Sequence, residues 1–411
     1  MCCLVKRRKS KPPPPHSSAP HSRGSHGELQ HDSLSSSIFV SSATELSSTS
    51  TCSIASIKDI LSDGPSVFRF EEICVATCNF DPAQKVGRSV WKASLHNRMV
   101  AISRKQGRAR NFTSVLSRVR ALHHQNLVKL LGACHEGDYI YLVYDFMESS
   151  NLRDCLRSKL GVSFSALSSW IPRIRVALDV AKGLEYLHHM SSPPLIHKHI
   201  ASRNILVGND LRAKVAHVGV SVLTGEVEFA NTKVPVRLAE NDAGEIQPET
   251  SNRRMARSRS VKIHGIQGYM PPEYLRSGEV TSKYDVFAFG VILAEIISGR
   301  EAAPSVYEQS KSRQAAKPVS LPDYLLSVMT GDDSKSKLRR WMDPLLRDSF
   351  PLDDAHRVAS TATACLDPDP LKRPDMSDVG LRLQKLLASA EKYDAAIGAQ
   401  QELMTASLQP R

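Results

Sequence analysis

Hydrophobic and polar positions follow different periods in successive parts of this chain. Residues 92–103 (KASLHNRMVAIS) and 139–146 (YIYLVYDF) form short alternating runs rich in β-branched and aromatic side chains, which predicts strands. Longer runs repeat apolar residues at three- and four-residue steps, which predicts helices over residues 68–80, 170–189, 285–299 and 355–366. A small strand-rich lobe followed by a larger helical lobe predicts a bilobal α+β fold with a cleft between the lobes.

The first 65 residues have a different composition from the rest. Ser, Thr, Pro and His dominate there and aromatic residues are almost absent, so the segment buries too little surface to offset chain entropy, and we predict a disordered Ser/Pro-rich basic tail. We expect a helix beside the domain at residues 66–83 and the folded domain at 84–390. Within it, the small lobe covers 84–147 and the large lobe 148–390. Residues 391–411 are predicted to form a C-terminal tail.

Several classes of protein are excluded by composition. No run of apolar residues is long enough to span a bilayer, and the start, MCCLVKRRKSK, does not resemble a secretory signal. The eight cysteines are scattered, which indicates free thiols in a reducing compartment and neither a zinc module nor a disulfide framework. The net charge is +12, but the basic clusters at 6–11 and 253–262 lack interleaved aromatic residues, so we expect no nucleic-acid partner.

The N-terminal basic cluster lies beside two cysteines. S-acylation of Cys2 and Cys3, together with the basic residues at 6–11, would supply the two signals that stable anchoring at an anionic membrane surface requires. The alternative is an unmodified, solvated N-terminus. The first interpretation predicts a cytoplasmic protein that is peripheral at the inner face of the plasma membrane.

Five motifs occur in the order typical of one enzyme family. They are FRFEEICVATCNF (68–80), HHQNLVKLLGACHEGDYIYLVYDFMESSNL (123–152), GLEYLHH (183–189), GYMPPEYLRSGEVTSKYDVFAFGVILAEIISGREA (268–302) and PDPLKRPDM (368–376). With these motifs the chain resembles the plant receptor-like kinases over about residues 68–387. The MPPEY, WMDP (341–344) and FPLD (350–353) motifs resemble the LysM-type branch of that family.

The resemblance implies a phosphate-binding apparatus, and several of its parts are absent. The lysine of the V-A-I-K strand is replaced by Ser103, and the glutamate that would pair with it is replaced by Val115. The loop that covers the phosphates is shortened to VGRSV, between Gly87 and Val90. Lys105 lies two residues after Ser103, so on a strand the two side chains point to the same face. Lys105 is therefore a candidate substitute for the missing lysine, displaced by one pleat along the strand.

The catalytic and metal-binding motifs are altered as well. In IHKHIASRN (196–204), His199 replaces the aspartate base and Ala201 replaces the assisting lysine, and His217 replaces the magnesium-binding aspartate of D-F-G. Imidazole is a poor magnesium ligand, so Asn204 is the one retained protein ligand. His199 and His217 are also candidates for a zinc-type ion, but two histidines are fewer ligands than such ions usually have, so we predict no metal site.

Residues with structural roles in the family are retained. The resemblance implies an ion pair between Glu273 and Arg373, a loop held by Asp285, and structural roles for His197 and Gly219. The positions that would contact a nucleotide also remain. We therefore predict that no cofactor is required and that ATP without magnesium is the one candidate. The alternative is an empty cleft. These nucleotide-binding candidates are Gly87, Val90, Ala101, Asp145, Met147 and Asn204.

The segment corresponding to the activation loop, residues 217–273, is long and polar, and we expect a mobile loop there. Ser251, Ser258 and Ser260 lie near arginines and are candidate phosphorylation sites. Together these features predict a catalytically impaired kinase homologue, a pseudokinase, that acts as a signalling scaffold or allosteric partner of other receptor-like kinases or receptor complexes. The alternative is an atypical active Ser/Thr kinase that uses Lys105 and His199.

Overall fold

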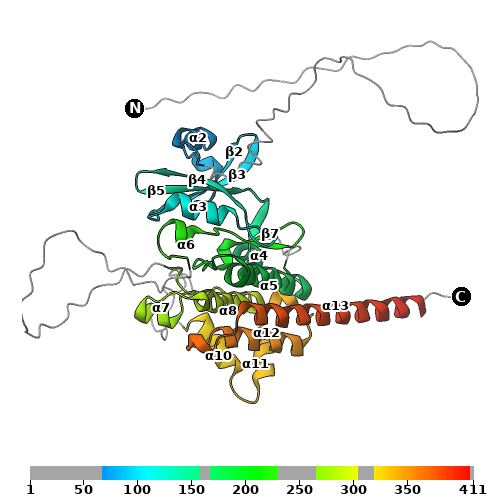
Figure 1. The fold of residues 1–411 in the computed structure, drawn as a ribbon. Helices are drawn as coiled ribbons and strands as arrows, with labels where there is room; N and C mark the ends of the chain where they lie inside the picture. The colour runs from blue at the N-terminus through cyan, green and yellow to red at the C-terminus, as the bar shows by residue number, and fades with distance from the viewer. Residues whose placement is uncertain (1–66, 158–166, 230–264, 304–318, 408–411) are drawn as a thin grey trace, which may run out of the picture. The chain divides into compact units, whose positions relative to one another are not determined.

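The structure is a computed structural model that describes residues 67–157, 167–229, 265–303 and 319–407 (Figure 1), and only the backbone of residues 397–407. The predicted tail at 1–65, the acylation candidates Cys2 and Cys3 and the candidate phosphorylation sites Ser251, Ser258 and Ser260 lie outside these residues. The fold is α+β, with a strand-rich small lobe followed by a helical large lobe.

The small lobe is built on an antiparallel sheet with the strand order β1-β2-β3-β5-β4. Its strands are β1 (Lys85–Gly87), β2 (Val90–Leu95), β3 (Arg98–Gln106), β4 (Leu130–Glu136) and β5 (Tyr139–Asp145). Helix α3 (Phe112–Arg120) packs on β4, and helix α2 (Phe70–Ala76), followed by a 3-10 turn at Pro82–Gln84, contacts β2 and β4. The predicted helix at 66–83 is therefore two short helical segments.

The two faces of β3 have different neighbours, because successive side chains on a strand point in opposite directions. Val100 and Ile102 are buried in an apolar cluster with Ile73 of α2. Ala101 instead packs against the main core, which continues into the large lobe. Ala101 and Ser103 therefore share the face of the sheet that is turned away from α2.

The large lobe begins with a three-stranded sheet, β6 (Ser149–Asn151), β7 (Ile205–Gly208) and β8 (Ala213–Val215). Its longer helices are α5 (Trp170–Glu185), continued by a π-helical turn at Tyr186–Met190, α8 (Ser282–Ser298), α12 (Leu352–Cys365) and α13 (Met376–Ser407). Shorter helices are α4 (Leu152–Arg157), α6 (Val220–Leu223), α7 (Pro272–Ser277), α10 (Leu321–Met329) and α11 (Ser334–Trp341). The 3-10 turns lie at Ser202–Asn204, Pro344–Leu346 and Pro370–Lys372.

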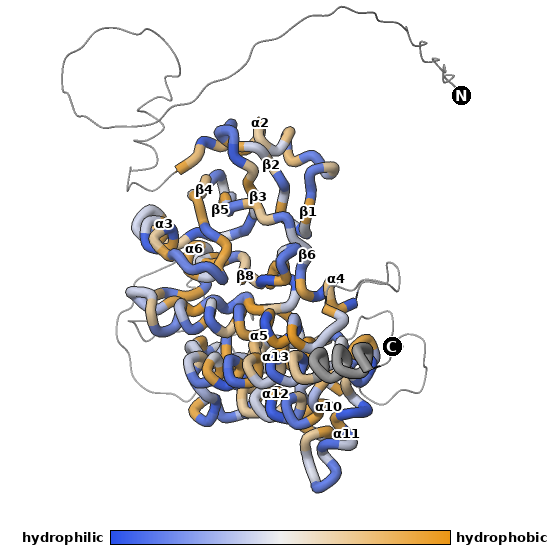
Figure 2. The backbone as a smooth tube through the Cα atoms, turned by 90° about the vertical axis from the view of Figure 1, so that its right-hand side faces the viewer, coloured by the Kyte–Doolittle hydropathy of each residue, from blue (hydrophilic) through white to orange (hydrophobic). Residues whose placement is uncertain are grey.

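Hydrophobic and hydrophilic segments alternate along the strands and helices of both lobes (Figure 2). Helix α8 is the exception, since every residue from Tyr284 to Ser298 is buried. It contacts α5, α10 and α12, so it forms the centre of the helical lobe. Within the described ranges, no helix is both long enough and apolar enough to cross a membrane.

The predicted C-terminal tail at 391–411 is helical as far as Ser407. Helix α13 does not end at residue 390, where we placed the start of a tail, but continues to Ser407. The sequence AEKYDAAIGAQQELMTAS after Ser389 is rich in Ala, Glu, Gln and Leu and contains no proline, so nothing in it terminates a helix. We missed this continuation because the apolar periodicity of the helix weakens once it no longer packs on a core.

Candidate functional site

The segment Ile196–Asn204 is held at the centre of the molecule by a buried carboxylate of helix α8. Asp285 accepts hydrogen bonds from the backbone N–H groups of His197 (2.7 Å) and Lys198 (2.8 Å) and contacts Nε2 of His188 at 2.9 Å. Lys198 has a left-handed backbone (φ 64°), which is uncommon for a residue with a side chain. Asp285 therefore fixes the backbone of the segment that contains His199.

His197 joins this segment to the one that follows β8. Its Nε2 lies 2.9 Å from the carbonyl oxygen of Ala216, and the ring is fully buried. Burial lowers the pKa of His197 to about 4, despite the nearby charge of Asp285, so the ring is neutral at physiological pH.

Gly219 has φ 80°, and a Cβ there would approach the Val119 side chain of α3 to 2.3 Å, so both the backbone angle and the packing require glycine.

His217 occupies the position where the resemblance implies a magnesium-binding aspartate. Its backbone is left-handed (φ 65°), and its Nδ1 is buried without a hydrogen-bond partner among the described residues. Burial, followed by the charge of Lys105, lowers the pKa of His217 well below its usual value, so the imidazole is neutral. Its ring meets that of Tyr144 edge-on, with centroids 6.0 Å apart, while the Tyr144 hydroxyl donates to the carbonyl of Val218 (2.9 Å).

His199, at the position of the expected base, faces a carboxylate that we did not predict. Glu226 follows helix α6, and its Oε2 lies 2.9 Å from Nζ of Lys198 and 3.3 Å from Nε2 of His199. The first contact is a hydrogen bond, whereas the second lies within ion-pair distance but lacks hydrogen-bond alignment. Burial disfavours the charged form of Glu226, but the contact with His199 and the charge of Lys198 outweigh it and lower the pKa to about 2.

The two positions where the resemblance implies a paired lysine and glutamate are uncharged and at least half-buried in the structure. Ser103 is fully buried, and its hydroxyl has no hydrogen-bond partner in the described part of the chain. Val115 of α3 is half-buried against the main core, where a glutamate would have stood opposite a lysine. Because both charges are absent, neither leaves a buried unpaired ion behind.

Lys105 lies on the same face of β3 as Ser103, as expected from the alternation of the strand. Its side chain is half-buried, and burial lowers its pKa, with Glu226 opposing this effect and Arg203 adding to it. The ammonium thus lies in the electrostatic range of the segments that contain His199 and Glu226. Arg104 points the other way, over the rings of Trp91 and Tyr139, at 5.6 and 5.3 Å from the ring centroids.

The candidate nucleotide contacts are partly occupied by the protein itself. The backbone N–H of Asp145 donates to the carbonyl of Lys129 (3.0 Å), and the Asp145 carboxylate is held by Arg98 through two bonds of 2.9 and 2.7 Å. Val90, Ala101 and Met147 are half-buried, and Gly87 is exposed at the end of β1. The amide nitrogen of Asn204 donates to the carbonyl of His199 (2.6 Å).

A magnesium ion does not fit the residues present. The ion prefers several hard oxygen ligands, but here imidazoles stand at both aspartate positions, the buried His217 ring is neutral, and Glu226 is engaged with Lys198. No group of three or more His, Cys, Asp or Glu side chains suited to a metal ion occurs in the ranges that the structure describes. Among the described residues, His199 and His217 are thus not joined by a third side chain of these types that would complete a metal site.

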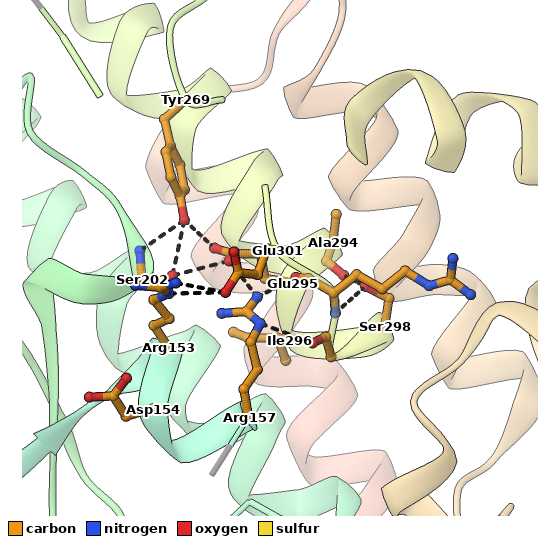
Figure 3. A network of polar contacts seen from close by, with 12 residues as sticks. Arg153, Asp154, Arg157, Ser202, Tyr269, Ala294, Glu295, Ile296, Ser298 and Glu301 are labelled. Carbon is orange, nitrogen blue, oxygen red and sulfur yellow. Dashed lines mark hydrogen bonds and ion pairs between the residues drawn. The ribbon is translucent and has the colours of Figure 1, made fainter. Parts of the chain in front are cut away.

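A buried polar network beside Ala201 was not predicted from the sequence (Figure 3). Glu295 of α8 accepts hydrogen bonds from the Tyr269 hydroxyl (2.5 Å), the Ser202 hydroxyl (3.1 Å) and Arg157 of α4 (2.6 Å). Tyr269 comes from the segment that precedes α7, so the network connects that segment to the loop containing His199. Burial raises the pKa of Glu295, and the charge of Arg157 opposes this shift. A glutamate inside an apolar helix is the sequence signal that we passed over.

The ion pair implied by the resemblance is present. Both terminal nitrogens of Arg373 bind the carboxylate of Glu273, at 2.6 and 2.7 Å, and Arg373 also donates to the carbonyl groups of Asp367 (2.7 Å) and Lys283 (3.0 Å). Arg373 is buried, and Glu273 lies in α7, at the end of the activation-type segment. The retained residues therefore stabilise the end of this segment against the helical lobe.

Comparisons with known proteins agree with this geometry. Residues 84–240 and 242–383 match the family model described as protein tyrosine and serine/threonine kinase. LysM domain receptor-like kinase 10 of Oryza sativa subsp. japonica is 35% identical over 332 residues, which cover 80% of this chain and 49% of that protein. LysM domain receptor-like kinase 3 of Arabidopsis thaliana is 31% identical over 375 residues, which cover 87% of this chain and 53% of that protein.

A shorter relative matches over most of its length. PTI1-like tyrosine-protein kinase 3 of Arabidopsis thaliana is 30% identical over 349 residues, which cover 81% of this chain and 76% of that protein. The chain spans about half the length of the LysM relatives that it matches, so the similarity concerns their kinase portion. The bilobal fold, the retained Glu273–Arg373 pair and these matches together show that the chain belongs to the protein kinase family, within the plant receptor-like kinases of the LysM group.

Proposed function

We propose that this kinase domain is catalytically impaired and acts as a signalling scaffold or allosteric partner of other receptor-like kinases. One observation carries the proposal: the positions of the base and of the metal-binding aspartate are both occupied by histidine, and the carboxylate nearest to His199, that of Glu226, is already bound to Lys198. Phosphoryl transfer depends on positioned charge around the phosphates and their metal ions. A neutral His217 cannot supply that charge.

The retained contacts support a role for the folded surface. Asp285 still holds the loop of His199, and Arg373 still holds Glu273, although neither contact performs chemistry. Replacing a buried, paired charge usually destabilises a fold, so these contacts contribute to the shape of the helical lobe. A domain with its architecture intact and its chemistry removed is suited to binding a partner.

No cofactor is required for this function. If a nucleotide binds, we expect ATP without magnesium, because His217 replaces the metal-binding aspartate while neighbouring cationic side chains would offset part of the phosphate charge. The charge of Arg203 contributes to lowering the pKa of Lys105, and Arg88, from the shortened loop, lowers the pKa of Arg203 after burial does. In the described ranges none of these three side chains forms an ion pair with a carboxylate.

One observation favours the alternative, an atypical active Ser/Thr kinase. Lys105 is half-buried on the face of the sheet that contains Ser103, and its charge reaches Glu226 and His217. In that alternative Lys105 would hold the phosphates and His199 would accept the substrate proton. Ser103 replaces the usual lysine, and Val115 replaces the glutamate that would orient a substitute such as Lys105. We therefore prefer the scaffold function to the active kinase.

The scaffold role is tested by co-purification from plant cells. A tagged full-length chain should recover specific receptor-like kinases from membranes, and the double variant His199→Ala, Asn204→Ala should recover the same kinases in similar amounts. Loss of those kinases with the double variant, while its thermal melting is unchanged, would show that binding depends on the cleft chemistry and would favour the active kinase. The tag alone gives the background, and recovery no higher than that background from the unaltered chain would contradict the scaffold directly.

A further inference from the structure

A pocket of about 540 Å³ is lined by neither His199 nor His217, although it shares Asp145 and Met147 with the nucleotide-binding candidates. Its walls are the loop between α3 and β4, the segment that follows β5, and strand β8 of the large lobe. The residues that matter for its chemistry are Leu122, His123, Lys129, Asp145, Phe146 and Lys214. The volume falls in the range of pockets that accept a small molecule or a single large side chain.

The walls of this pocket are fixed by backbone hydrogen bonds. The N–H of Val128 donates to the carbonyl of Val215 (2.9 Å), and the N–H of Val215 donates to the carbonyl of Asn126 (2.8 Å). The N–H of Asp145 donates to the carbonyl of Lys129 (3.0 Å), which joins the second wall to the first. A ligand would therefore enter a preformed pocket and would not have to order a loop, which lowers the entropic cost of binding.

The pocket has an unbalanced positive charge. Lys129 of the small lobe and Lys214 of the large lobe both line it, and neither makes an ion pair or a side-chain hydrogen bond within the described ranges. Asp145 is the one carboxylate among its lining residues, and Arg98 already binds both of its oxygens. Burial, followed by the charges of Lys129 and Arg120, lowers the pKa of His123, so the imidazole lies within the electrostatic range of Lys129.

The surrounding sequence extends this charge over the small lobe. Between Asp81 and Glu136 the chain contains eleven Lys and Arg residues and no Asp or Glu. Helix α3 contributes Arg118 and Arg120 to this stretch and has no acidic residue in its first turn. The small lobe also contains acidic residues outside this stretch, such as Glu136 and Asp138, but an anionic partner that approaches the stretch itself would meet an excess of positive charge, which favours rapid association.

We propose that this pocket binds a phosphorylated side chain of a partner protein. A phosphomonoester has a charge near −2 and three strong acceptor oxygens, which suits the two lysines and the neighbouring His123. The apolar side chains of Leu122 and Phe146 would contact the carbon part of the phosphorylated residue, which inorganic phosphate lacks. A concave pocket with fixed walls also fits a protruding side chain better than the flat surface of a bilayer.

A phosphate in this pocket would bridge the lobes, because Lys129 and Lys214 come from different sides of the segment that joins them. Binding would then stabilise one arrangement of the small lobe relative to the large one, without any contact with His199. The inference goes beyond the scaffold function, since it holds whether or not the cleft transfers phosphate. If the phosphopeptide does not bind, the scaffold proposal is unaffected, and the reverse also holds.

Fluorescence polarisation with labelled peptides tests this assignment on the full-length chain. The probes are a capped pentapeptide with a central phosphotyrosine between glycines, its phosphoserine counterpart, and the same peptides without phosphate. We expect at least one phosphopeptide to bind about tenfold or more tightly than its unphosphorylated form, and Lys129→Gln and Lys214→Gln each to weaken it about tenfold. Lys385→Gln, on an exposed face of α13, removes the same charge elsewhere and should leave the affinity unchanged.

Other outcomes would overturn the proposal. Equal affinity for phosphorylated and unphosphorylated peptides would show that the pocket does not recognise phosphate, and equal losses in Lys385→Gln and Lys129→Gln would show that only net charge matters. Displacement of the peptide by inorganic phosphate at the peptide's own concentration would reduce the site to a small-anion site. Binding of phosphatidylserine vesicles, lost in the lysine variants and without binding of phosphopeptide, would assign the surface to a membrane. The double variant Lys129→Arg, Lys214→Arg should retain binding, which separates loss of contacts from loss of folding.

Discussion

Replacing Glu226 with glutamine should weaken the attachment of the activation-type segment to the loop of His199. The substitution preserves the size of the side chain but removes the charge that Lys198 and His199 contact at 2.9 and 3.3 Å. The folded state lowers the pKa of Glu226 from 4.5 to about 2. Each unit of such a shift corresponds to about 1.4 kcal/mol of stability, so the shift gives an upper bound of about 3 kcal/mol.

The expected loss is smaller than that bound. The Glu226 side chain is 24% exposed, so solvent screens part of the interaction. We therefore expect Glu226→Gln to lower the free energy of unfolding by about 2 kcal/mol at pH 7. Because the folded pKa is depressed, the stabilisation is fully present above the unfolded value of 4.5 and disappears as the pH falls through about 2. The difference between the two proteins should therefore be constant from pH 7 to about pH 5.5 and should fall to less than about half by pH 3.

Urea unfolding followed by tryptophan fluorescence measures this difference at each pH. Asp353→Asn is the matched control, because it removes a carboxylate from an ion pair with Lys335 in which both side chains are mostly exposed, and it should cause no measurable loss. If Glu226→Gln costs no more than Asp353→Asn, the Lys198–Glu226 contact does not hold the segment. A difference that stays constant down to pH 3 would show that the loss arises from packing and not from charge.

Three further outcomes are expected. Arg373→Ala should lower the free energy of unfolding by about 3 to 5 kcal/mol because it leaves Glu273 partly buried and unpaired, whereas Arg339→Ala, in an exposed pair with Asp348, should have no measurable effect in the same urea titration. The triple variant Ser103→Lys, His199→Asp, His217→Asp should gain magnesium-dependent ATP affinity by calorimetry but little turnover, since Val115 and the shortened loop remain; ordinary kinase turnover would show that these two features matter little. Cys2→Ser, Cys3→Ser should move the protein from the membrane pellet to the soluble fraction, and equal sedimentation of both forms would end the acylation hypothesis.

The losses at the catalytic positions could be predicted from the sequence, because motif spacing assigns each position without any knowledge of its neighbours. Ser103, His199 and His217 are examples, and the bilobal fold followed from the change from two-residue to three- and four-residue periodicity. The pairing of Glu273 with Arg373 could be stated for the same reason, since both residues lie in well-defined motifs.

The compensating contacts could not be predicted in this way. Glu226 lies in a polar segment without periodicity, so its position beside Lys198 depends on how the chain turns after α6. Glu295 looked like an isolated charge in an apolar helix, and its partners Tyr269 and Arg157 come from distant segments. The Arg98–Asp145 pair likewise joins two strands whose register no sequence pattern specified. Such contacts depend on tertiary geometry, which local patterns do not encode.

The most direct test of impaired catalysis is phosphate transfer from labelled ATP to a general protein substrate, measured on the purified full-length chain with magnesium or manganese. We expect incorporation no higher than that of the His199→Ala variant, because neither protein has the base and the metal-binding carboxylate that the reaction requires. Robust transfer by the unaltered chain that His199→Ala abolishes would contradict the account and would establish His199 as the working base of an active kinase.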